Sequence, residues 1–298
     1  MLVLFKGEIA ALSAALFWAL ASVVYSQVGQ KISPIGLNLI KGIIAIVLLL
    51  LTILLHSPDF PNVPIFTIQL LLLSGLIGIG IGDSAYFATL KYLGARRGLL
   101  LETLAPPLTA ILAFIFLGER LSILAWCGIL LTILGIAWVI SERTDQSISF
   151  ETHFWRGIGF GIIAEFCQAT GVILSHFALN QTEISPLWSA LIRLIGGTVI
   201  LLIYFITRPQ NLKIVFQPLK SKKVISIIFI ATFLGTYLGI WLQQTSLKFT
   251  AAGIAQGLLA TSPLFVLPIA ATMGERISLP AILGAGIAIL GVILLFQG

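Results

Sequence analysis

The chain of 298 residues is 58% hydrophobic and only 9% charged, whereas soluble proteins carry about 25% charged residues. Its mean hydropathy is +1.10. These values exclude a soluble protein and predict an all-α polytopic membrane protein. The net charge of +6 arises from basic residues in short breaks between apolar runs, a distribution typical of membrane topology. We therefore expect the chain to have a lipid bilayer as its partner and no nucleic acid.

Ten apolar segments are long enough to cross a bilayer, whose hydrocarbon core of about 30 Å needs roughly 20 helical residues. In chain order the segments are 8–28, 34–56, 65–89, 98–117, 122–141, 155–177, 186–207, 224–244, 251–273 and 279–296. The first segment imitates a signal peptide. It has a counterpart in the second half of the chain, so we expect it to be a retained transmembrane helix.

One short motif occurs twice. Residues 118–122 read Gly-Glu-Arg-Leu-Ser, and residues 274–278 read Gly-Glu-Arg-Ile-Ser, 156 positions later. The tripeptide Ile-Ser-Pro likewise occurs at 32–34 and 184–186. Self-similarity at a long period indicates a duplicated unit. We interpret the Gly-Glu-Arg motif itself as a turn that ends one helix and lets the next one pack.

The duplication divides the chain into a first repeat, 8–141, a linker, 142–154, and a second repeat, 155–297. Each repeat holds five expected helices, and this odd number makes the second repeat enter the membrane from the opposite side. Many transporters are built from such inverted repeats and bind their substrate near the bilayer midplane, where the repeats meet.

Two cations lie at matching depths in the two repeats. Lys41 is seven residues past Pro34, and Arg193 is seven residues past Pro186, which is about 10 Å along a helix. One hypothesis is that both cations flank a central cavity and attract an anionic or zwitterionic substrate. The alternative is that each one extends to the near interface or pairs with a carboxylate.

Asp83 follows a glycine-rich run at residues 78–82, and Tyr86 shares its helix face. The glycines favour close helix packing or local unwinding. A carboxylate at this depth needs a partner or a water-filled cavity, because charged groups in the bilayer are costly. We therefore expect Asp83 and Tyr86 to face the cavity.

Glu102 stands four residues before Pro106, and a proline inside a helix frees a backbone carbonyl. We expect Glu102 to face the cavity as well. The alternative for this residue is an ion pair with Arg97 or Lys41.

Glu165 lies ten residues into the sixth expected helix, with Gln168 on the same face. Its depth makes it the best candidate for a proton acceptor, since burial favours the neutral form of a carboxyl group. Tyr237, Trp241 and Gln244 form a stripe on the eighth expected helix and complete the predicted substrate-binding set. Packing is the alternative role for this stripe.

Nothing in the sequence indicates catalysis, a cofactor or a metal site. His56, His153 and His176 are scattered near helix ends, and both cysteines fall inside apolar runs. We therefore expect a protein that is not an enzyme and that has no catalytic residues.

The duplicated unit resembles the EamA branch of the drug/metabolite transporter superfamily. The first repeat carries Glu-Thr-Leu-Ala-Pro-Pro at 102–107, and Leu-Gly-Glu-Arg-Leu-Ser follows at 117–122. The second repeat carries Thr-Ser-Pro at 261–263 before its own Gly-Glu-Arg. The resemblance implies ten helices and a cavity lined by the first four helices of each repeat, with the fifth helix at the periphery. It also implies a basic residue early in the second helix of each repeat, where this sequence has Lys41 and Arg193.

The orientation in the membrane has two indications that disagree. Loops on the side of the termini carry three basic residues and loops on the opposite side carry eleven, which favours termini outside because Lys and Arg gather on the cytoplasmic side. Eukaryotic branches of the superfamily are described with cytosolic termini. Both orientations stay open.

Together these features predict a transporter of a small organic metabolite, such as an amino acid, in a bacterial inner membrane. We expect alternating access between the repeats, with proton coupling possible through Glu165. The alternatives are an uncoupled facilitator or exchanger of an anionic metabolite, and a membrane scaffold subunit that transports nothing.

Overall fold

The computed structural model describes residues 5–56, 62–117, 122–141, 149–208, 215, 219, 221–250, 252–272 and 278–297. This part of the chain is helical and contains no strand. The first half contains α1 (Lys6–Val28), α2 (Pro34–His56), α3 (Ile65–Gly75), η1 (Leu76–Asp83), α4 (Ser84–Glu102), α5 (Ala105–Leu117) and α6 (Ile123–Ser141). The second half contains α7 (Ser149–Asn180), α8 (Pro186–Thr207), α10 (Lys222–Thr232), η3 (Phe233–Leu238), α11 (Gly239–Phe249), α12 (Ala252–Leu259), α13 (Ser262–Thr272) and α14 (Leu279–Gln297).

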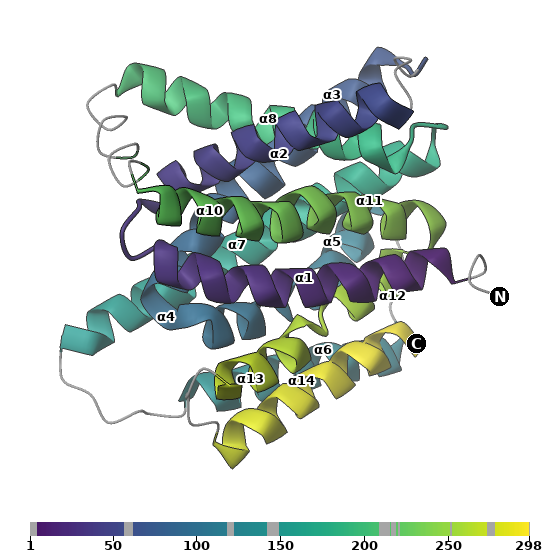
Figure 1. The fold of residues 1–298 in the computed structure, drawn as a ribbon. Helices are drawn as coiled ribbons and strands as arrows, with labels where there is room; N and C mark the ends of the chain where they lie inside the picture. The colour runs from purple at the N-terminus through teal and green to yellow at the C-terminus, as the bar shows by residue number, and fades with distance from the viewer. Residues whose placement is uncertain are drawn as a thin grey trace.

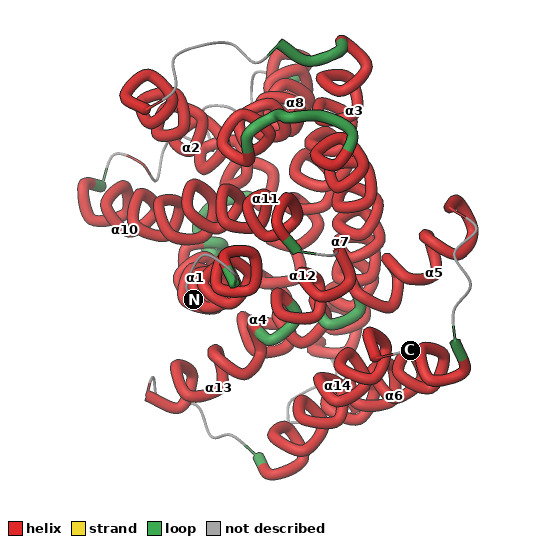
Figure 2. Tube along the Cα trace, turned by 90° about the vertical axis from the view of Figure 1, so that its right-hand side faces the viewer, coloured by secondary structure: helices red, strands yellow, loops and turns green. Residues whose placement is uncertain are grey.

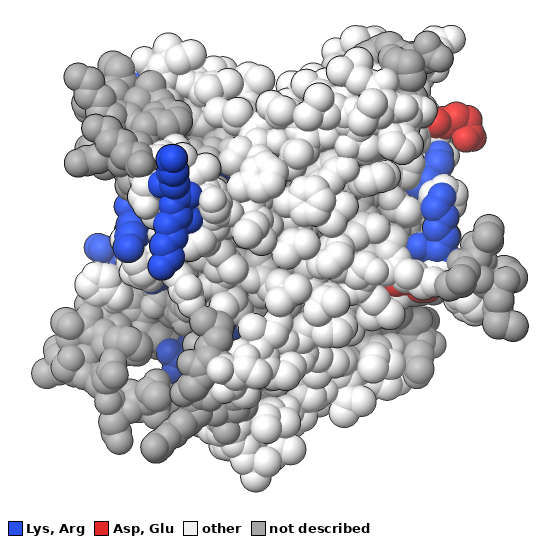
Figure 3. Space-filling view, viewed as in Figure 1, with Lys and Arg blue, Asp and Glu red and all other residues white. Residues whose placement is uncertain are grey.

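The helices run side by side across the molecule, with α2 and α8 on one side, α1 and the α10–α11 helix in the middle, and α6 and α14 on the other side (Figure 1). Both ends of the chain lie at the same end of the bundle. Viewed from a perpendicular direction, most helices are seen nearly end-on (Figure 2). Charged side chains gather at the two ends of the bundle and leave its middle uncharged on the face shown in Figure 3. This is the distribution expected of a protein whose middle faces lipid.

Six described helices are long and apolar enough to span a membrane, namely Lys6–Val28, Pro34–His56, Ile65–Glu102, His153–Asn180, Pro186–Thr207 and Lys222–Phe249. The bounds 34–56 and 186–207 match the expected segments, because each helix begins at a proline that fits the first helical turn. Shorter apolar helices fall within the expected fifth, ninth and tenth spans. The integral membrane class is thus supported, and the count of ten stays a prediction.

Two of the expected spans are interrupted. The span expected at 98–117 breaks between Glu102 and Ala105, and the span expected at 251–273 breaks between Leu259 and Ser262. The physical cause is the same at both places. Prolines at 106, 107 and 263 lack the N–H that would continue the helix, and neighbouring hydroxyls bond to the preceding carbonyls instead. The Thr103 hydroxyl donates to Leu100 O at 2.7 Å, and the Ser262 hydroxyl donates to Leu259 O at 2.9 Å.

The third and eighth expected spans each contain a stretch of wider π-helix, η1 and η3. Such stretches are rare and often occur at functional sites. The α3–η1 helix crosses α8 at very short range, because glycines face backbone on both sides. A methyl group added at Gly75 would lie 1.8 Å from Arg193 O, and one added at Gly196 would lie 2.3 Å from Leu72 O. This crossing joins the first half to the second.

The last helices of the two halves, α6 and α14, pack against each other at the edge of the molecule (Figure 2). Gly135 faces the backbone of Gly284 and Ala288, and Gly291 faces the backbone of Gly128 and Thr132. The structure therefore places the fifth expected helix of each half at the periphery, in agreement with the family resemblance.

Two expected segments lie partly or wholly outside the described residues. The paired Gly-Glu-Arg motifs fall there, as does most of the linker. α7 begins at Ser149, six residues before the expected start of the sixth span. A helix satisfies its own backbone hydrogen bonds, so it continues past the apolar segment into the polar residues before it.

We expect the stability of the protein to depend on the close crossing of α3 and α8 at Gly75. Gly75→Ala forces the α3 and α8 backbones apart and should lower the free energy of unfolding by about 1–3 kcal/mol, measured as a lower melting temperature in detergent micelles. The matched control is Gly159→Ala, because a methyl group there meets no atom within 4 Å. Equal melting temperatures for the two variants would contradict the close crossing.

Candidate functional site

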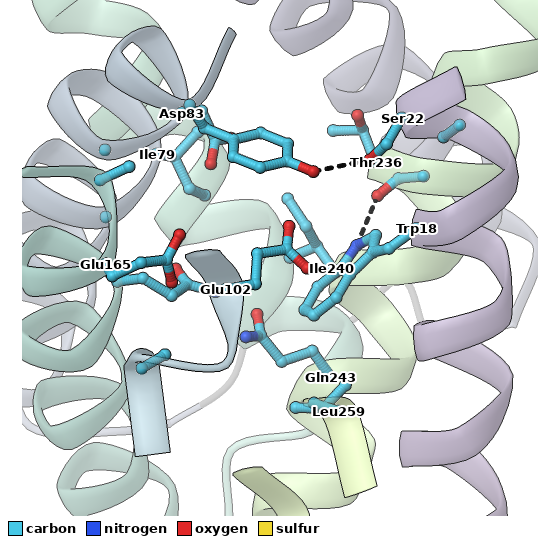
Figure 4. A pocket seen from close by; sticks show the side chains of 18 of the residues that line it. Trp18, Ser22, Ile79, Asp83, Glu102, Glu165, Thr236, Ile240, Gln243 and Leu259 are labelled. Carbon is cyan, nitrogen blue, oxygen red and sulfur yellow. Dashed lines mark hydrogen bonds between the residues drawn. The ribbon is translucent and has the colours of Figure 1, made fainter. Parts of the chain in front are cut away.

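A cavity of about 90 Å³ lies in the middle of the molecule, between the two halves. Its walls come from α1, α2, η1, α4 and α5 of the first half and from α7, α8, η3, α11 and α12 of the second. Seven of the ten residues predicted from the sequence line it: Lys41, Asp83, Tyr86, Glu102, Glu165, Gln168 and Arg193. Figure 4 shows the carboxylates of Asp83, Glu102 and Glu165 on one side of this space and Trp18 across from them on α1.

Lys41 and Asp83 form an ion pair inside the first half. Lys41 is almost completely buried, with 5% of its side chain exposed, and Asp83 keeps 25% exposed toward the cavity. The neighbouring Asn38 holds η1 against α2, because its amide donates to Ile79 O at 2.7 Å and to Gly80 O at 3.2 Å. Asn38 thereby satisfies carbonyls of the π-helical stretch. Lys41 thus has the alternative role expected from the sequence, in which it pairs with a carboxylate.

Arg193 has no such carboxylate partner among the described residues. Its side chain is buried, and one guanidinium nitrogen donates to Gln243 Oε1 at 3.2 Å. The Nε of Arg193 and the amide nitrogens of Gln243 and Gln256 are also buried, and within the described part of the chain they donate to nothing. Buried donors normally have acceptors. All three side chains line the cavity, so this wall offers several N–H groups to an acceptor placed there.

Glu102 on α4 and Glu165 on α7 line the cavity from helices of different halves. Glu165 is 3% exposed, and the two carboxyl groups are close enough to interact electrostatically with each other and with Asp83. The described ion pairs are Lys41–Asp83 and Lys248–Glu183. The alternative expected for Glu102, an ion pair with Arg97 or Lys41, is not among them. Tyr86 stands beside Glu102, and its hydroxyl is hydrogen-bonded to the hydroxyl of Ser22 at 2.8 Å.

The sequence model of the EamA-like transporter family matches residues 5–141 and matches again at residues 155–297. The chain belongs to this family. It is an integral membrane protein and a membrane transporter, in accord with the drug/metabolite transporter resemblance seen in its sequence.

Curated relatives agree with the family. An uncharacterized transporter of Archaeoglobus fulgidus is 25% identical over 289 residues, which cover 95% of each chain. Protein LicB of Haemophilus influenzae is 28% identical over 69% of this chain and 70% of its own length. The uncharacterized transporter YyaM of Bacillus subtilis is 28% identical over 74% of this chain and 70% of its own length.

A solved crystal structure shares the fold. It superposes with a TM-score of 0.70 and covers 97% of this chain and 95% of its own, at 13% sequence identity. At this identity the likeness concerns the fold alone.

Three predicted residues of this EamA-like transporter lie outside the cavity. The Tyr237 hydroxyl is hydrogen-bonded to Thr52 at 2.8 Å, Trp241 packs beside Tyr237, and Gln244 accepts a hydrogen bond from Ser189 at 2.8 Å. All three face α2 and α8 instead. The cavity is lined by Thr236, Ile240 and Gln243, each one residue earlier. The two triplets have the same helical spacing, so the prediction chose the neighbouring face of this helix, which packs against α2 and α8.

Several cavity residues were not predicted, and all of them are uncharged. Trp18 donates to Gly235 O at 2.9 Å, and the Tyr25 hydroxyl contacts Thr232 and Thr236 at 3.2 Å each. Both line the cavity from α1, together with Ser22. One signal was present in the sequence, since Trp18, Ser22 and Tyr25 recur at helical spacing in an alanine-rich helix.

The buried ion pair gives a stability prediction. Asp83→Asn leaves Lys41 buried without a counter-charge and should lower the free energy of unfolding by about 3 kcal/mol. The double variant Asp83→Asn/Lys41→Met removes both charges and should regain most of that loss. Thermal unfolding in detergent measures both effects.

The matched control for this cycle is Glu183→Gln, which breaks the pair that Lys248 forms at 3.9 Å with a fully exposed carboxylate. A surface pair contributes about 0–1 kcal/mol, so this variant should unfold near the wild-type temperature. A double variant as unstable as Asp83→Asn alone would contradict the pairing.

Proposed function

We propose that this EamA-like transporter carries a small zwitterionic metabolite, such as an amino acid, across a bacterial inner membrane, and that it is coupled to protons. The observation that carries the proposal is the charge arrangement of the central cavity. One buried cation, Arg193, and two carboxyl groups, Glu102 and Glu165, line the same space outside any described ion pair.

The unpaired groups match the two ends of a zwitterion. Arg193 and its neighbours Gln243 and Gln256 offer N–H donors to a carboxylate, and a guanidinium fork suits that group well. Glu102 and Glu165 offer acceptors to an ammonium group. Burying a charge is unfavourable unless it is paired, so a ligand with both signs is bound at a lower desolvation cost than one with a single charge.

The small size of the cavity supports alternating access. Its volume is about 90 Å³, whereas ligand pockets usually measure about 300–1,000 Å³. A metabolite therefore needs a wider conformation to enter. The two expected spans are interrupted after Glu102 and after Leu259, both on the cavity wall. We expect the helices to bend at these two breaks. Movement of one half against the other then exposes the cavity to each side in turn.

Proton coupling is supported by the two carboxyl groups. Two negative charges in one buried site repel each other, and a proton on either group removes that repulsion. Glu165, on α7, is the more deeply buried candidate. A substrate ammonium group and a proton would compete for the same carboxyl groups, which is one way to link substrate release to proton uptake.

The structure gives less support to the two alternatives, an uncoupled exchanger and a scaffold subunit. An uncoupled exchanger of anions depended on two free cations, but Lys41 is neutralised by Asp83. A scaffold subunit has no need of a polar cavity between its halves. Both ideas remain distinguishable by transport assays with purified protein.

We expect Glu165→Gln to abolish coupling while keeping a transport-competent fold, because glutamine keeps the size of the side chain but takes up no proton. Proteoliposomes would first be screened with the common amino acids, and the best substrate would then be followed with and without an imposed pH gradient. The wild type should respond to the gradient and Glu165→Gln should not. Glu183→Gln, exposed at the bundle end, is the control. An unchanged response in Glu165→Gln would remove the coupling claim.

We expect Arg193 to recognise a carboxylate. Loss of a charged hydrogen bond costs about 1.5–3 kcal/mol, so Arg193→Gln should weaken amino-acid binding by about 10- to 150-fold. The decarboxylated amine of the same compound should bind both proteins alike. Thermal shifts with both ligands measure this, with the exposed Lys223→Gln as control. Equal losses for acid and amine would count against a carboxylate site.

A further inference from the structure

A second cavity lies on the side of the molecule, between α4, η1 and the start of α2 in the first half and α7 and α8 in the second. Its volume is about 680 Å³. Its walls are mostly apolar and include Ala88, Ile163, Ile200 and Leu201. Ile163 is 49% exposed on the lipid-facing side, so this cavity opens sideways toward the bilayer. We call it the lateral groove.

The inner end of the lateral groove, where η1 meets α4, offers few hydrogen-bonding groups. Its serine is engaged within the protein, because Ser84 Oγ donates to Gly80 O at 2.7 Å. Ser33, which precedes α2 at the outer end, is engaged as well, since its Oγ accepts from the Gly36 N–H at 3.2 Å. A polar metabolite would lose its hydration at the inner end without regaining hydrogen bonds. An apolar chain is the ligand that this part of the groove fits.

The other end of the groove is basic. Near three of its helices, α4, α7 and α8, a cation stands about one turn beyond a lining residue, toward the bundle end opposite the termini. On α4, Lys91 follows Ala88 by three residues, and on α7, Arg156 precedes Phe160 by four. After α8, Arg208 lies four residues beyond Tyr204, and its guanidinium stands 5.7 Å from the centre of the Tyr204 ring. Residues at these spacings share a helix face.

Aromatic residues stand between the apolar and basic ends. Tyr92 stacks on Phe160 with ring centres 6.1 Å apart, and Tyr204 lines the opposite wall. Tyrosines are typical of the depth at which lipid headgroups begin. From its inner end outward the groove is thus apolar, then aromatic, then cationic, which is the order of an anionic phospholipid from its acyl chain to its phosphate.

We propose that the lateral groove binds an anionic phospholipid, with an acyl chain between α4, α7 and α8 and the phosphate held by Lys91, Arg156 and Arg208. Basic pockets between membrane helices on the side rich in Lys and Arg are where anionic headgroups bind. The inner wall of the groove is Gly80 and Ile81 of η1, and the other face of η1 lines the central cavity through Ile79 and Asp83. The bound lipid therefore packs against the face of η1 that points away from the central cavity. The packing of η1 then depends on the lipid composition of the membrane.

Lipid titration of the purified full-length chain tests the site. Native mass spectrometry would follow binding of phosphatidylglycerol and of phosphatidylcholine with the same acyl chains. Phosphatidylglycerol should bind more tightly to the wild type and raise its melting temperature more. Arg156→Gln/Arg208→Gln should weaken phosphatidylglycerol binding about 30-fold, which corresponds to ~2 kcal/mol.

Two further variants separate the groove from general surface charge. Lys222→Gln/Lys223→Gln removes the same charge from exposed residues at the start of α10, outside the groove walls, and should keep the preference for phosphatidylglycerol. Ala88→Phe fills the groove and should reduce binding of both lipids to this site.

Three results would overturn the proposal. They are equal binding of the two lipids by the wild type, an equal loss in the Lys222→Gln/Lys223→Gln control, and the same stabilisation by glycerol 3-phosphate, which has a phosphate but no acyl chain. The first two would assign the basic residues to the general surface. The third would assign them to a soluble phosphate ligand.

Discussion

The contact between α3–η1 and α8 is the constraint on which the rest of the site depends. Glycines at 75 and 196 let the two backbones approach to a distance that no side chain would allow. In a bilayer such contacts replace the hydrophobic effect as the source of helix association, since lipid is as apolar as leucine. The crossing point is at Arg193 itself, so the same contact that joins the two halves fixes the depth of the buried guanidinium.

The charges around that crossing follow a simple division. One pair, Lys41 and Asp83, is neutralised inside the first half, where Asn38 also supports the π-helical stretch. The remaining groups, Arg193, Glu102 and Glu165, face one another across the cavity from both halves. The first set is suited to holding a structure together. The second set is suited to a ligand that comes and goes, because its electrostatic balance is completed by what enters.

Much of the fold follows from local rules in the sequence. Pro34 and Pro186 set helix starts that match the structure. Charges inside apolar runs identified five cavity residues, and helical spacing from two of them added Tyr86 and Gln168. The errors concern one face of one helix. The stripe of Tyr237, Trp241 and Gln244 has the same spacing as the stripe one residue earlier that lines the cavity. Helical periodicity cannot tell which of two adjacent stripes faces the cavity, because that depends on how the helix packs against α2 and α8.

The location of the Lys41–Asp83 pair also bears on how the protein is made. Membrane proteins are synthesised from the N-terminus, and domains generally fold as units in that order. Lys41 belongs to α2, and Asp83 ends the α3–η1 helix that comes next in the chain, so the two costly charges can neutralise each other while the first half inserts. Arg193 has no acid in its own α8. The glycines that it packs against come from both halves, Gly75 and Gly78 from α3 and η1 and Gly171 from α7. The buried site of this arginine is therefore complete only when the two halves have come together.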